Sequence, residues 1–118
     1  MTGLSLFLSC LLFLSCAMTP PPERSFDPAL LRDGIYEGSY RGGPNKAVVR
    51  VSIAEGKISS IKVVEHQAWR GRKAEKPIVE RIIASQSTTV DAVSGATNSS
   101  RVIMNAVQNA VEKAYLPK

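Results

Sequence analysis

Hydrophobic and polar residues alternate along the first half of the folded part of the chain, which predicts antiparallel β-strands. Three such segments occur, at residues 35–40, 46–53 and 58–65. The first places Tyr36, Gly38 and Tyr40 on one face. Residues 54–57 form a hairpin signal between the second and third strands. The three strands therefore predict a meander with one apolar face that another layer must cover.

The apolar pattern then changes from the period of a strand to the period of a helix. Pro77 suits the first turn of a helix that runs to about Ser85. Residues 100–115 repeat apolar residues at helical spacing, and Gln108 is expected on the outward, polar side. Two amphipathic helices packed on one face of a small antiparallel sheet of three or more strands predict an α+β domain.

The first 32 residues differ in composition from the rest of the chain. Residues 4–14 are mainly apolar, a run too short to span a bilayer comfortably but suited to a secretory signal. This run ends in Leu-Ser-Cys, which resembles a bacterial lipoprotein signal in which Cys16 becomes the lipidated first residue. We therefore predict a signal peptide over residues 1–15, a lipidated Cys16 with a Pro-rich tether over 16–32, and one domain over 33–118.

Two features of this segment depart from a lipoprotein signal. Residues 1–3 carry no Lys or Arg, and Phe13 stands where such signals usually have Leu. Cys10 is an earlier candidate for lipidation. An uncleaved signal anchor is the other interpretation.

Composition restricts the chemistry of the folded part. Both cysteines lie within the first 16 residues, so the domain has no disulfide, thiol nucleophile or cysteine-based metal site. His66 is the sole histidine, and its place after a predicted strand favours a loop position over a metal site. The net charge is +5, but only residues 70–73 are densely basic, as a solvated loop is. Scattered charge predicts no nucleic-acid partner and suits anionic membranes, acidic redox partners or a flavin phosphate.

Residues 91–97, Asp-Ala-Val-Ser-Gly-Ala-Thr, carry the most specific signal in the chain. They precede the second helix, and a helix N-terminus offers free backbone N–H groups and partial positive charge to a phosphate. Gly95 permits a close approach of the backbone to a ligand. Hydroxyls accompany it at Ser94, Thr97, Ser99 and Ser100. The plainer interpretation is a helix start with Ser99 or Ser100 as N-cap.

This segment resembles the flavinylation motif of the FMN-binding domain family, roughly Asp-x-x-Ser/Thr-Gly-Ala-Thr, and the likeness extends over about residues 33–114. The resemblance implies that Thr97 is esterified to the phosphate of FMN. It also implies that a dedicated flavin transferase takes this FMN from FAD and releases AMP. The predicted cofactor site consists of Thr97 with Asp91, Ser94, Gly95, Ala96, Ser99 and Ser100.

The combined prediction is a flavoprotein electron carrier of the bacterial cell envelope, anchored by lipid to the membrane and working with membrane-bound or extracytoplasmic redox partners. The same family contributes subunits to sodium-pumping NADH:quinone reductases, but this chain resembles a stand-alone carrier. A basic, lipid-anchored envelope binding module without flavin is the alternative. A self-sufficient reductase is disfavoured, because the chain has no Gly-x-Gly-x-x-Gly fingerprint. Candidates for contact with the flavin ring are Tyr36, Tyr40, Trp69 and His66.

Overall fold

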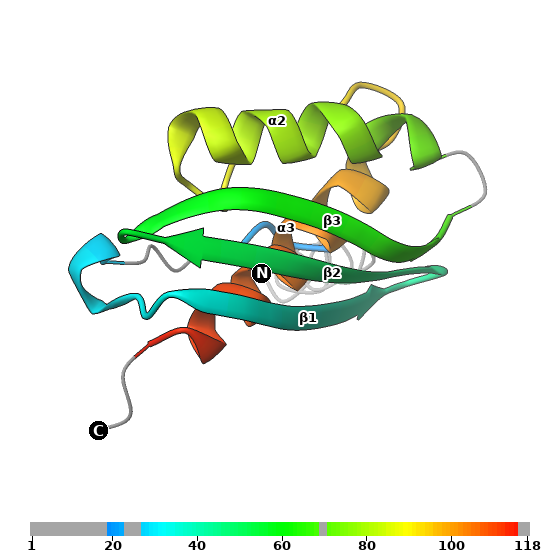
Figure 1. Cartoon of the computed structure of the whole chain (residues 1–118). Helices are drawn as coiled ribbons and strands as arrows, with labels where there is room; N and C mark the ends of the chain where they lie inside the picture. The colour runs from blue at the N-terminus through cyan, green and yellow to red at the C-terminus, as the bar shows by residue number, and fades with distance from the viewer. Residues whose placement is uncertain (1–18, 23–26, 69–70, 116–118) are drawn as a thin grey trace, which may run out of the picture.

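A computed structural model of the chain describes residues 19–22, 27–68 and 71–115. In this part, a three-stranded antiparallel sheet is covered by two α-helices (Figure 1). The elements in chain order are η1 (Pro28–Leu30), β1 (Gly34–Gly42), β2 (Asn45–Ala54), β3 (Lys57–Gln67), η2 (Gly71–Ala74), α2 (Glu75–Ser85) and α3 (Thr97–Lys113). This arrangement confirms the predicted α+β class.

The sheet is a simple meander with strand order β1-β2-β3. The turn between β2 and β3 has Glu55 at φ 55° and Gly56 at φ 73°. Two consecutive residues with positive φ are typical of a tight hairpin loop, whose twist matches that of its strands. The hairpin predicted from the sequence is therefore confirmed.

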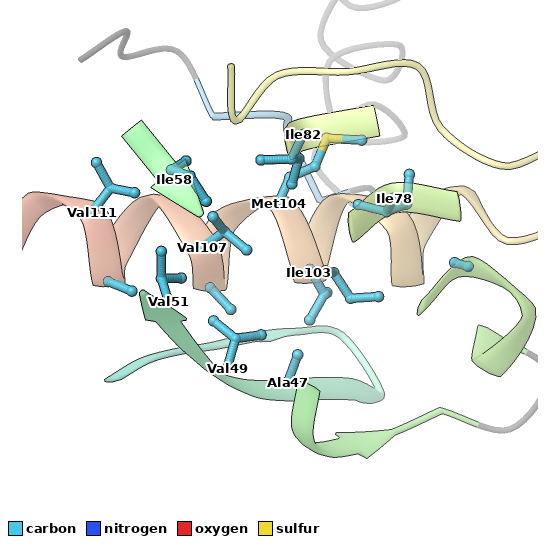
Figure 2. Packing of buried hydrophobic residues seen from close by; sticks show 14 of the residues in the cluster. Ala47, Val49, Val51, Ile58, Ile78, Ile82, Ile103, Met104, Val107 and Val111 are labelled. Carbon is cyan, nitrogen blue, oxygen red and sulfur yellow. The ribbon is translucent and has the colours of Figure 1, made fainter. Parts of the chain in front are cut away.

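The apolar core lies between the sheet and the two helices. From β2, Val49 and Val51 are fully buried. Helix α3 runs across this face, with Ile103 and Val107 beside the strand residues, while Met104 lies beside Ile82 of α2 (Figure 2). Each such buried aliphatic side chain contributes about 1.5–3 kcal/mol to folding. The helix is therefore held from two sides, by β2 below it and by α2 above it.

Close packing of α3 on β1 depends on glycine. A Cβ at Gly38 would collide with the backbone of α3 at Ala106 and Ala110. At the end of the same strand, the Asn98 amide donates a hydrogen bond of 2.9 Å to the carbonyl of Gly42. These contacts fix the first turn of α3 beside the β1–β2 turn, which is where the candidate site lies.

Two irregularities in β3 change which of its side chains face inward. The pairing with β2 shifts between Ser52 and Ile53 and again between Val48 and Val49. Each extra residue in β3 reverses the alternation. As a result His66 lies inside the strand with its side chain 2% exposed, and the predicted loop histidine is wrong.

Gln108 also differs from its predicted outward position, because it is only 5% exposed. Its amide oxygen accepts a 2.6 Å hydrogen bond from the Thr88 hydroxyl, and its amide nitrogen donates to Glu112 at 3.0 Å. A buried amide is stable when its polar atoms are bonded in this way.

Parts of the predicted tether lie against the domain. The carbonyl of Pro20 accepts a hydrogen bond from Asn105, and the carbonyl of Pro22 accepts one from Thr89. Leu31 forms a β-bridge with Tyr115. The predicted signal peptide and Cys16 lie outside the described residues. Within the described ranges, no helix is long and apolar enough to cross a bilayer.

Candidate functional site

The loop before α3 contains a tight turn. The Ala96 N–H donates a 2.9 Å hydrogen bond to the carbonyl of Val93, closing a four-residue turn. Gly95 adopts φ +80°, a conformation that favours glycine because it has no Cβ. Ser94 and Gly95 are exposed at the tip of this turn. A side chain at position 95 would therefore strain the turn.

Ser100 holds the turn to the helix but does not cap it. Its hydroxyl donates to the carbonyl of Ala96 at 2.7 Å and accepts from the N–H of Val93 at 3.0 Å. Because α3 begins at Thr97, Ser99 and Ser100 lie inside the helix and are buried. The predicted N-cap at Ser99 or Ser100 is therefore wrong.

Helix α3 starts without a side-chain cap. Its N-cap residue is Ala96, which has no hydroxyl or carboxylate to accept from the first amides. Thr97 is the first residue of the helix and is half-buried. Among the described residues, its hydroxyl has no hydrogen-bond partner. The first turn thus combines free backbone donors with a free hydroxyl, as a phosphate site requires.

A cleft of about 440 Å³ opens beside this first turn. Its lining residues come from β2, η2 and the loop–helix junction: Asn45, Gly71, Gly95, Ala96, Thr97, Asn98 and Ser99. Asn45 donates a 3.0 Å hydrogen bond to the Ser99 hydroxyl. A Cβ at Gly71 would collide with the same serine, so η2 lies directly against α3.

The structure brings four of the predicted site residues to this cleft and leaves three outside its lining. Gly95, Ala96, Thr97 and Ser99 line it. Ser94 is exposed on the turn, and Ser100 is buried behind it. Asp91 borders a different hollow with Arg81, whose guanidinium donates a 2.7 Å hydrogen bond to the Asp91 carbonyl.

Sequence reasoning missed three residues of the cleft, Asn45, Gly71 and Asn98. Asn45 stands in a sequence that indicates only a turn, and Gly71 lies in the basic segment that indicates only a solvated loop. Asn98 directly follows the motif, and this adjacency is the one signal that pointed to it.

The candidate ring contacts differ in where they lie. The Tyr36 hydroxyl donates to the carbonyl of Arg32 at 3.0 Å, near the start of β1 and at the opposite end of that strand from the cleft. Tyr40 packs on the core and does not line the cleft. Trp69 lies outside the described residues.

His66 pairs with a carboxylate and does not line the cleft. Its Nδ1 lies 2.8 Å from Oε2 of Glu75, the first residue of α2, and its Nε2 has no hydrogen-bond partner. Within the described ranges, no three His, Cys, Asp or Glu side chains gather as metal ligands. The pair therefore joins β3 to α2, next to η2.

Loss of the Ser100 bridge should destabilise the domain. Ser100→Ala removes the acceptor of the part-buried Val93 N–H, and we expect the free energy of unfolding to fall by about 2 kcal/mol. Ser94→Ala, in the same loop but exposed, should change it by less than about 0.5 kcal/mol. Urea midpoints of the two variants measure the difference. Equal midpoints would show that the bridge does not stabilise the loop.

The sequence of this chain is similar to one protein family and to parts of larger proteins. The profile of one family, described as the FMN-binding domain, matches residues 42–112, which include both β2 and the whole motif. An uncharacterized protein of Treponema pallidum is 35% identical over 101 residues, covering 80% of this chain and 27% of that protein. The NADH:acrylate oxidoreductase of Vibrio harveyi is 33% identical over 89 residues, covering 74% of this chain and 9% of that enzyme. The chain thus spans about a quarter or less of these relatives.

Proposed function

The chain belongs to the FMN-binding domain family, and from this membership we propose that it is an extracytoplasmic electron carrier with FMN attached through a phosphoester bond to Thr97. One observation supports Thr97 as the attachment site. Thr97 presents an unbonded hydroxyl at the uncapped first turn of α3, on the wall of the cleft. The other hydroxyl among the described lining residues, that of Ser99, accepts a hydrogen bond from the Asn45 amide.

The proposed attachment is a group transfer from FAD. Oγ1 of Thr97 attacks the phosphorus of the FMN half, a new P–O bond forms, and the bond to the AMP phosphate breaks. AMP leaves, and the hydroxyl proton goes to a base of the flavin transferase. No oxidation or reduction occurs in this step.

The residues around Thr97 fit this group. Gly95 and Ala96 carry little or no side chain, which keeps the hydroxyl open to a docking enzyme. After transfer, the phosphodiester keeps one negative charge, and the N-terminus of α3 stabilises it by about 0.3–1 kcal/mol. No side chain of the described cleft lining is a base. We therefore propose that the flavin transferase supplies the base that activates Thr97.

The bound flavin supplies the electron transfer, and the protein holds and orients it. A covalent bond suits a protein outside the cytoplasm, because a dissociated flavin would be lost there. The relative from Vibrio harveyi is named for electron transfer from NADH to acrylate. For this chain we propose membrane-bound or extracytoplasmic redox partners and no nucleic acid.

Covalent flavin tests this proposal directly. Exported protein made with a flavin transferase should be yellow after denaturation and heavier by one FMN less one water. The same protein made without the transferase is the control and should carry no covalent flavin. Protein that stays colourless in both preparations would favour the alternative, a basic envelope binding module.

Membrane attachment tests the proposed location. We propose that Cys16 is lipidated after removal of residues 1–15. Wild-type protein is expected in the membrane fraction, and Cys16→Ser in the soluble or unprocessed fraction, measured by fractionation and mass spectrometry. Cys10→Ser is the matched control and should behave as wild type. Membrane attachment that survives Cys16→Ser would indicate an uncleaved signal anchor.

A further inference from the structure

A lysine from a distant element lies over the turn before Thr97. A Cβ built on Gly95 would stand 2.8 Å from Nζ of Lys73 and 3.6 Å from its Cε. The ammonium therefore occupies the space that the missing Gly95 side chain leaves open. Lys73 belongs to η2, which packs against α3.

The backbone of η2 is fixed, so Lys73 is presented to the turn by a rigid element. Ala74 is fully buried in the core. Gly71 is buried against Ser99, where a Cβ would collide. Immediately after η2, Oε2 of Glu75 lies 2.8 Å from Nδ1 of His66. Only the side chain of Lys73 is free to adjust.

Lys73 has no negative partner in the described part of the chain. The ion pairs there are Arg50 with Glu37, and His66 with Glu75. The first turn of α3 contains no acidic residue. The ammonium of a lysine is a compact positive charge of the kind found in phosphate-binding sites, and here it lies beside the uncapped N-terminus of α3.

We propose that Lys73 binds the flavin phosphate at Thr97, first in the incoming nucleotide and afterwards in the phosphodiester. The proposal rests on the proposed function, and it assigns to η2 a part in holding the cofactor. It also gives a second reason for glycine at position 95, because a side chain there would displace the ammonium.

Flavin binding without covalent attachment tests Lys73 independently of the transferase. In a Thr97→Ala background, fluorescence quenching gives the Kd of free FMN and of riboflavin, the same flavin without phosphate. We expect FMN to bind about fivefold more tightly than riboflavin at about 50 mM salt, because of one screened charge pair. Adding Lys73→Gln should reduce that preference to the part that the N-terminus of α3 supplies, whereas Lys73→Arg in its place should keep most of the preference.

The matched control is Arg72→Gln, which removes an equal charge from the residue before Lys73 in η2; Arg72 is also exposed. It should keep the preference for FMN. Raising the salt to about 0.5 M should weaken the preference more in the Arg72→Gln variant than in the Lys73→Gln variant. A phosphate preference that is undiminished in Lys73→Gln, or is reduced equally in Arg72→Gln, overturns the proposal. Failure of the transferase to load wild-type protein would instead overturn the covalent attachment.

Discussion

Thr97→Ala is expected to abolish covalent flavin, from about one FMN per chain to none, while leaving the fold intact. The substitution deletes the sole hydroxyl on the described cleft wall that has no hydrogen-bond partner. Alanine is a good helix former and removes no bond that holds α3. Intact mass and the fluorescence of the denatured protein measure the loading. The denaturant midpoint measures the fold.

Two variants control for this result. Ser39→Ala removes an exposed hydroxyl of β1, outside the motif and the cleft lining, and should load as wild type. Thr97→Ser keeps a hydroxyl at the attachment position and should retain part of the loading. Covalent flavin on Thr97→Ala would show that another residue is the attachment site. Thr97→Ala protein with a midpoint well below that of wild type would attribute the loss to unfolding.

Much of the fold was predictable because its segments carry regular patterns. In β2, inward-facing Val49 and Val51 alternate with outward-facing Arg50, and one face is buried as expected. The hairpin followed from Gly56 between two strand-like segments, since glycine readily adopts the positive φ that a tight hairpin loop requires. Sequence patterns therefore predicted the strands and the hairpin, whose conformation depends on residues that are close together in the chain.

Other features depended on partners far away in the chain. The inward position of His66 results from extra residues in β3, which no alternation pattern reveals in advance. Ser100 has the chemistry of an N-cap, but its hydroxyl bonds the N–H of Val93 across the turn, and the helix begins earlier. The cleft needs η2 to reach α3, and Gly71 gave no sign of that contact. The motif located Thr97, and tertiary packing supplied its surroundings.

Gly38→Val is expected to lower the free energy of unfolding by about 3 kcal/mol or more, because it overpacks a contact between two backbones. A Cβ at this position would meet the backbone of α3 at Ala106 and Ala110. The helix has no room to retreat, since Met104 on its other side packs with Ile82 of α2 (Figure 2). For a small domain with a total stability of about 5–15 kcal/mol, such a loss is large. Urea denaturation of flavin-free protein measures it.

The neighbouring Ser39→Val is the matched control, because Ser39 is exposed on the opposite face of β1. Valine favours strands, so this variant should unfold within about 0.5 kcal/mol of wild type. Gly38→Val should also reduce flavin loading, because a displaced α3 moves its first residue, Thr97, away from Gly71 and the rest of the cleft. Full loading and an unchanged midpoint in Gly38→Val would contradict the direct packing of α3 on β1. Reduced loading with an unchanged midpoint would place the effect of Gly38 at the flavin site and not in the core.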